Sequence, residues 1–194
     1  LIFFLLLFCF SCGTEPGSNK YQNLILDEIT IDDIHSGYKS DKFTVKEIVK
    51  KYIDRIREID TNGPTINSVI IVNPDALVIA DSLDQIHKKG GIKGPLFGIP
   101  VLLKDNIDTR DKMPTTAGSR VLKNSFPLRD SWVAMKLREA GAIILGKTNL
   151  SEWANYRASY SSSGWSGVGG QTKNPYVLDR NPCGSSSGSA VAVS

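Results

Sequence analysis

The spacing of apolar residues predicts an alternation of helices and short strands along the chain. The most regular helical pattern follows Thr44, where apolar residues recur at intervals of three and four as far as Asn62-Gly63. Thr44 and Glu47 have the spacing of a capping box, in which two side chains satisfy free backbone N–H groups at a helix start. Thr30 and Asp33 have the same spacing and predict a short helix through His35. We therefore expect two helices before residue 63.

Three short apolar runs predict strands, at residues 68–72, 98–104 and 142–145. Two further helical patterns lie between them, one from the cap Asn73 with Pro74 in its first turn to Gly90-Gly91, and one from Asp130 or Ser131 to Ala140. We interpret residues 68–104 as a βαβ unit whose strands pair in parallel. The expected fold class is α/β, a mixed and largely parallel sheet flanked by helices.

Residues 1–10 are almost entirely apolar but too few to span a bilayer as a helix. They are typical of the apolar region of a secretory signal, and Ser11-Cys12 resembles a bacterial lipobox, in which the cysteine is lipidated. A plain signal peptide or a truncated membrane anchor is the alternative. Residues 13–23 have the composition of a tether, which leaves residues 24–194 as the folded part. We expect an exported protein anchored to the membrane through Cys12, with a periplasmic or secreted protein as the alternative.

The composition excludes few classes of function. The chain has 194 residues, a net charge of +3 and no block of Lys and Arg, so nucleic-acid binding is not favoured. Two His and three scattered Cys are too few for a zinc site, and we expect no metal or other cofactor. The chain has no starting Met and ends within an apolar run, so we expect it to be part of a longer protein.

Lys104 ends the second strand pattern, at the sheet edge where the ligand sites of α/β proteins gather. Burial at such a position lowers the pKa of the amine, because a low dielectric disfavours the ammonium form. A neutral, proton-accepting lysine is one interpretation. The other is a lysine that reaches solvent or pairs with Asp105 or Asp108.

A Gly/Ser turn, residues 184–189, runs into Ala190-Val191-Ala192-Val193. Glycine permits close approach of the backbone, and hydroxyls beside a helix start are candidate nucleophiles or proton carriers. A flexible linker would not continue into an apolar run, and the Gly-Lys-Ser/Thr ending of a phosphate-binding loop is missing. We interpret the segment as a structured active-site loop.

Residues 158–170 are rich in Ser, Gly, Tyr and Trp and predict either a mobile surface loop or a loop that covers a substrate. Four aromatic residues in and before this segment indicate either core packing or contact with an apolar or aromatic acyl group: Trp153, Tyr156, Tyr160 and Trp165.

Four segments together, in this order, resemble the amidase signature family: residues 94–106 with Lys104, 140–152, 170–175 and 181–189. The resemblance covers about residues 24–194, the amino-terminal portion of a longer domain. It implies the α/β/α fold of that family and hydrolysis of the C–N bond of a small carboxamide to a carboxylate and ammonia or an amine.

By position in the motif, Lys104 corresponds to the family's catalytic lysine and Ser185 to the bridging serine, which the family holds on a cis peptide bond. Neutral Lys104 would accept a proton from Ser185, which would take the proton of a nucleophilic serine and later protonate the leaving amine. Gly184, Ser186 and Ser187 correspond to supporting positions of the substrate loop. The family's nucleophilic serine lies in a later Gly-Gly-Ser stretch, so we expect these residues alone to be inactive.

Two positions depart from the family, because Cys183 and Ser187 stand where many members carry Gly. No histidine is near Cys183 in sequence, so we interpret it as a small packed thiol, and His35 and His87 as helix residues. Two other functions remain open: the glutaminase subunit of the tRNA-dependent amidotransferase, and a non-catalytic, amidase-like binding lipoprotein. The sequence does not assign an oligomeric state.

Overall fold

The computed structural model describes residues 25–156 and 158–194. Their main sheet has the strand order β1-β3-β2, built from β1 (Val69–Val72), β3 (Ile143–Thr148) and β2 (Pro100–Lys104). Strand β3 is antiparallel to β1 and parallel to β2. The sheet is therefore mixed, and its central strand is buried along its whole length. The predicted cysteine anchor at Cys12, the signal segment and the tether lie outside the described residues.

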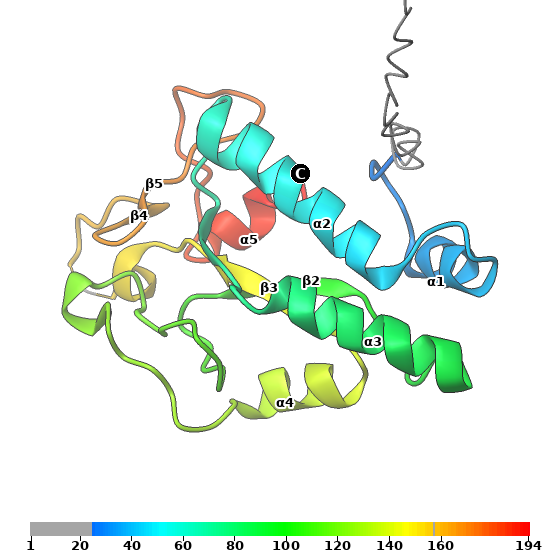
Figure 1. Cartoon of the computed structure of the whole chain (residues 1–194). Coiled ribbons are helices and arrows are strands. Elements are labelled where there is room, and N and C mark those ends of the chain that lie inside the picture. Colours follow the sequence, from blue (N-terminus) through cyan, green and yellow to red (C-terminus); the bar gives the residue numbers. More distant parts are fainter. Residues whose placement is uncertain (1–24, 157) are drawn as a thin grey trace, which may run out of the picture.

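Helices cover both faces of this sheet (Figure 1). One face packs against α1 (Ile31–Lys39), α2 (Val45–Arg55) and α3 (Ala76–Gly90), and the other packs against α4 (Trp132–Glu139). Successive side chains of β3 point to opposite faces of the sheet. Ile143 and Leu145 pack in the core on the side of α1, α2 and α3, and Ile144 packs in the core on the side of α4. The α/β class with helices on both faces is confirmed.

Both predicted capping boxes are present. Thr44 accepts the Glu47 N–H at 3.2 Å while the Glu47 carboxylate accepts the Thr44 N–H at 2.8 Å, and Thr30 and Asp33 make the same pair of contacts. Helix α2 continues as a wider π-helical segment, Ile56–Asn62. The Asp60 carboxylate of that segment accepts the backbone N–H groups of Ser68 and Val69, which ties the end of the helix to the start of β1.

The predicted parallel pairing of residues 68–72 with 98–104 is wrong. Strand β3 lies between β1 and β2, and the only parallel pair in the described residues joins β2 to β3 through α4. Periodicity identifies strands but not their order in the sheet, so the nearest strand in sequence was the wrong partner.

The predicted cap Asn73 is also misplaced. Helix α3 begins at Ala76 with Asp75 as its N-cap residue. Asn73 extends β1 instead, because its N–H donates to the Leu145 carbonyl and its side-chain amide donates to the Ile144 carbonyl. Its side-chain oxygen accepts the Asp75 N–H, which shapes the turn before the helix.

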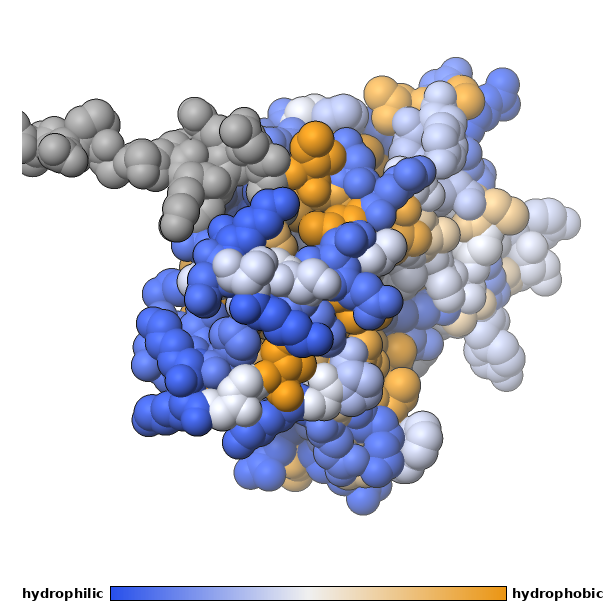
Figure 2. Space-filling model, turned by 90° about the vertical axis from the view of Figure 1, so that its right-hand side faces the viewer, coloured by the Kyte–Doolittle hydropathy of each residue, from blue (hydrophilic) through white to orange (hydrophobic). Residues whose placement is uncertain are grey.

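The side of the molecule that carries α1 and the end of α3 is mainly hydrophilic, and its apolar groups form separate small patches (Figure 2). None of the helices in residues 25–156 and 158–194 is long and apolar enough to cross a membrane.

Candidate active site

Lys104 and Ser185, 81 positions apart in the chain, are in contact. The Lys104 Nζ donates hydrogen bonds to Ser185 Oγ at 2.9 Å and to Ser186 Oγ at 3.0 Å. Lys104 is the last residue of β2, and the two serines belong to the turn that precedes α5 (Ser187–Val191), which packs on β2. We call residues 183–186 the signature turn. The structure therefore brings together the lysine and the serine that the sequence singled out.

Partial burial shifts the pKa of the Lys104 ammonium. Burial lowers the pKa of its ammonium below the usual value for lysine, since a low dielectric disfavours the charged form. The neutral amine is thus more accessible than in water, and a hydroxyl proton-transfer partner lies within hydrogen-bond distance. This combination suits a general base.

A second lysine, Lys147 on β3, lies behind the site and is fully buried. Its Nζ donates to the Ile107 carbonyl at 2.7 Å and to Thr115 Oγ1 at 3.0 Å. The Asp105 carboxyl is also fully buried, and it accepts a short hydrogen bond from the Thr116 hydroxyl. Burial raises the pKa of Asp105 and lowers that of Lys147, while the charge of each opposes the shift of the other.

The end of β3 and the residue that follows it hold α5 in place. The Thr148 and Ser189 hydroxyls lie 2.7 Å apart, and the Gly188 N–H donates to the Asn149 carbonyl at 3.0 Å. Gly188 has no room for a side chain, because a Cβ there would lie 2.3 Å from the Ser68 carbonyl oxygen. This close approach explains why glycine is needed at the first turn of α5.

The supporting positions behave differently from one another. Gly184 has a φ of +60°, the left-handed region that favours glycine. Ser186 contacts Lys104, whereas Ser187 is buried and its hydroxyl has no hydrogen-bond partner in the described residues. Cys183 is exposed, so the prediction of a packed thiol is wrong: its left-handed backbone, with a φ of +62°, turns the side chain out of the core.

Every peptide bond between described residues is trans, including those on either side of Ser185, so the cis bond that the resemblance implies is not observed. A cis bond between non-proline residues costs about 2.5–4 kcal/mol and requires surrounding contacts that impose it. The space around a side chain at Gly184 is open and Ser186 is exposed.

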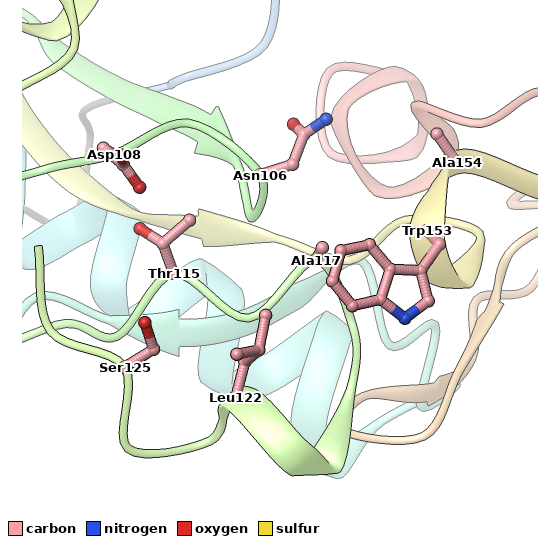
Figure 3. Close-up of a pocket in the computed structure, with 8 residues that line it drawn as sticks. All are labelled: Asn106, Asp108, Thr115, Ala117, Leu122, Ser125, Trp153 and Ala154. Atoms are coloured by element: carbon pink, nitrogen blue, oxygen red, sulfur yellow. The ribbon is translucent and has the colours of Figure 1, made fainter. Parts of the chain in front are cut away.

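A cavity of about 400 Å³ adjoins the carboxyl end of β2 (Figure 3). Its wall is mixed in character and comprises Asn106, Asp108, Thr115, Ala117, Leu122, Ser125, Trp153 and Ala154. Trp153 and Ala154 have left-handed backbones, an unusual conformation for residues with a Cβ. The backbone N–H of Trp153 donates to the Ala117 carbonyl at 2.9 Å, which holds the Trp153 backbone beside another residue of the cavity wall.

The aromatic residues of the loop do not form core. Trp153 is 43% exposed, Tyr156 94% and Tyr160 99%. Only Trp153 among the four predicted aromatics lines this cavity. Trp165 lies in a small hairpin, β4 (Trp165–Ser166) with β5 (Gly170–Gln171), so part of the predicted loop is regular structure.

Sequence reasoning missed the contributions of Lys147, Asn149 and Ser151. All three are fully buried polar residues, and the available signal in the sequence was a polar run that ends β3 and continues directly after it. The two histidines bond backbone carbonyls away from the site, as expected of helix residues. The described part of the chain contains no group of three or more His, Cys, Asp or Glu side chains arranged to hold a metal ion.

A lysine held against a Gly-Ser-Ser turn, at the carboxyl end of a strand in an α/β/α fold, defines a serine–lysine type of site. The sequence model of the Amidase family matches residues 47–194, and the chain belongs to that family. The chain is 47% identical to a probable amidase of Arabidopsis thaliana over 185 residues. The match covers 94% of this chain and 36% of the relative.

Solved structures agree with this assignment. The peptide amidase of Stenotrophomonas maltophilia superposes with a TM-score of 0.83 at 48% sequence identity, covering 86% of this chain and 34% of that one. One subunit of the glutamyl-tRNA(Gln) amidotransferase of Alkaliphilus metalliredigens is 42% identical over 87% of this chain and 33% of its own length. The chain thus spans about a third of the length of these relatives.

Proposed function

We propose that the complete protein hydrolyses the C–N bond of a small carboxamide, with Lys104 and Ser185 transferring protons. The observation that carries the proposal is the 2.9 Å contact between Lys104 Nζ and Ser185 Oγ at a site where burial lowers the pKa of the lysine. Membership of the Amidase family supports the same reaction.

The proposed reaction has two stages. In the first, neutral Lys104 accepts the Ser185 hydroxyl proton as Ser185 takes the proton of an attacking serine supplied by a later part of the chain. The attack forms a tetrahedral intermediate. Ser185 then protonates the nitrogen as the C–N bond breaks to leave an acyl-enzyme, and protonated Lys104 returns its proton to Ser185. In the second, water attacks the acyl-enzyme through the same relay and releases the carboxylate. The contacts of Lys104 with Ser185 and Ser186 match this relay.

The cavity beside β2 is the proposed site for the part of the substrate next to the reacting amide. Asn106 and Trp153 lie on its wall, so it offers one amide group and one large apolar surface (Figure 3). A mixed wall of this kind accepts a small amide with an apolar substituent.

The test is release of ammonia and the matching carboxylate from a panel of primary carboxamides by the complete protein. Lys104→Ala is expected to reduce kcat/KM by about 10²–10⁴, the usual contribution of a general base. Lys136→Ala is the matched control, because Lys136 is an exposed lysine of α4 paired with Glu139. Undiminished turnover in Lys104→Ala, or an equal loss in the control, would refute the assignment.

A second candidate function is the glutaminase subunit of a tRNA-dependent amidotransferase, favoured by the 42% identity to the Alkaliphilus protein. The two functions differ in substrate range. Hydrolysis of glutamine that depends on added partner subunits would support the amidotransferase, whereas hydrolysis of simple carboxamides by the protein alone supports the amidase. Binding of carboxamides without any turnover would support the non-catalytic alternative.

We also propose export with a lipid anchor at Cys12, on the basis of the apolar residues 1–10 and the Ser11-Cys12 pair. Metabolic labelling with a clickable fatty acid is expected to mark the protein in its membrane fraction. Cys12→Ser is expected to abolish the label. Retention of unlabelled protein in the cytosol would overturn the proposal.

A further inference from the structure

Ser151 makes an unusual set of contacts with the signature turn. Its side chain is fully buried, three residues beyond the end of β3. Its backbone N–H donates to the Ser185 carbonyl at 3.2 Å, and its hydroxyl donates to the Gly184 carbonyl at 2.9 Å. One residue thus holds two successive carbonyls, one on each side of the Ser185 α-carbon.

These two bonds define the backbone of Ser185. The Gly184 carbonyl belongs to the peptide plane that enters Ser185, and the Ser185 carbonyl belongs to the plane that leaves it. Restraining both planes restrains the φ and ψ of Ser185, and with them the direction of the Cα–Cβ bond that carries its hydroxyl. With the backbone in this orientation, the Ser185 Oγ lies 2.9 Å from Lys104 Nζ.

Within residues 25–156 and 158–194, few side chains pack against this turn. The position of a Cβ at Gly184 has no atom within 4 Å, Cys183 and Ser186 are exposed, and Ser185 is half-buried. Glycine at a positive φ also adds conformational freedom to the turn. Within this part of the chain, the hydrogen bonds of the turn are the main contacts that define its conformation.

The Ser151 hydroxyl also accepts a hydrogen bond. It accepts the Gly164 N–H at 2.8 Å, so the loop before β4 bonds the same oxygen that holds the signature turn. The hydroxyl has one proton to donate, and the Gly164 N–H on its lone pair favours donation toward Gly184. The buried hydroxyl is thereby held in one orientation.

From this geometry we propose that Ser151 is a positioning residue, which holds the Ser185 hydroxyl against the Lys104 amine through the two carbonyls that flank Ser185. The proposal rests on the proposed amidase function. It assigns no contact with substrate to Ser151. Its effect should appear in the rate of proton transfer and leave substrate binding nearly unchanged.

The test compares kcat and KM for a primary carboxamide in the complete protein and its Ser151→Ala variant. We expect kcat to fall about 10- to 100-fold, since a displacement of about 1 Å in a reacting group has effects of this size. KM should change by less than about threefold, because the variant leaves the cavity wall intact.

Ser166→Ala is the matched control. Ser166 is also a fully buried serine, and its hydroxyl likewise donates one bond, to Asn149 Oδ1 at 2.7 Å, and accepts one, from the Gly169 N–H at 2.8 Å. It makes no contact with the signature turn among the described residues. The control should lose similar thermal stability but keep kcat within about threefold of the wild type.

Equal values of kcat in Ser151→Ala and Ser166→Ala would overturn the proposal, as would a rise in KM that accounts for the whole loss. If Ser151→Ala does not fold, Ser151→Thr and Ser151→Cys carry the comparison. The hydroxyl of Thr is expected to preserve kcat better than the weak thiol donor of Cys, and equal rates would refute the role. A wild-type protein that hydrolyses no carboxamide would instead refute the proposed function, and the positioning role with it.

Discussion

The two lysines at the carboxyl end of the sheet differ in what surrounds them. Lys104 ends β2, is half-buried and donates to two serine hydroxyls. Lys147 stands on the neighbouring strand β3, opposite Leu103, and is fully buried between a carbonyl oxygen, a threonine hydroxyl and the charge of Asp105. Burial lowers the pKa of both amines.

The comparison shows that burial alone does not make a lysine a proton acceptor in catalysis. Lys147 is the more deeply buried, yet its amine donates to the Ile107 carbonyl and to the Thr115 hydroxyl, whose own proton is directed to the same carbonyl. Nearby carboxylates also favour the charged form of Lys147. Lys104 contacts two serine hydroxyl groups, which can exchange a proton with the amine. The partners of each amine, more than its depth, separate the structural lysine from the candidate catalytic one.

The largest expected effect on stability comes from Lys147→Met. Removing this ammonium takes away a positive charge that favours the ionised form of the buried Asp105 carboxyl, and it leaves the Ile107 carbonyl and the Thr115 hydroxyl without their donor. Each polar group left unsatisfied in the interior costs about 1–3 kcal/mol. Urea unfolding of the complete protein measures the loss. Lys104→Met is the control and should change the free energy of unfolding by no more than about 1 kcal/mol, because its amine is only half-buried. Equal decreases in the free energy of unfolding of the two variants would contradict the distinction between the two lysines.

A double substitution tests whether the charge of Asp105 causes the stability loss expected for Lys147→Met. Lys147→Met with Asp105→Asn removes both charges, and Asn keeps an oxygen to accept the Thr116 hydroxyl. Because removing both partners of a buried pair is often near neutral, we expect more than half of the lost stability to return. The same urea experiment checks it. A double variant as unstable as Lys147→Met alone would show that the charge of Asp105 is not the cause.

The pH dependence of kcat/KM tests the other lysine. Protonated Lys104 cannot accept a proton, so activity is expected to fall as the pH decreases through its pKa and to reach a plateau above it. Burial lowers this pKa, so the midpoint of the fall should lie below the usual value of about 10.4. Rates measured from neutral to alkaline pH give the midpoint. A midpoint at or above the usual lysine value would contradict a role for the buried amine as the base.

The sequence was most informative where chemistry is local. The Thr44–Glu47 capping box predicts the start of α2 because both partners lie within one helical turn. Lys104 and Ser185 were identified by their resemblance to family motifs, and the structure places them in contact. The order of the strands was not predictable in this way, because β1 and β2 each pair with β3, a strand at least 39 residues further along than the end of β2.

The same limit applies to Ser151 and Lys147. Neither residue type is unusual beside a strand, and their roles arise from contacts with residues 33 and 40 positions away. Only the folded chain shows that one holds the signature turn and the other balances a buried carboxyl. A run of polar residues after a buried strand indicates that such contacts exist but does not identify the partners.

The central claim is that Lys104 and Ser185 act as one proton relay, and a double-mutant cycle on kcat/KM tests it most directly. Lys104→Ala and Ser185→Ala should each reduce carboxamide hydrolysis by the complete protein by about 10²–10⁴. The kcat/KM of the double variant should lie within about threefold of the kcat/KM of the less active single variant, because groups that act as a unit lose their effect together. Losses that multiply in the double variant, or single variants with undiminished activity, would contradict the relay.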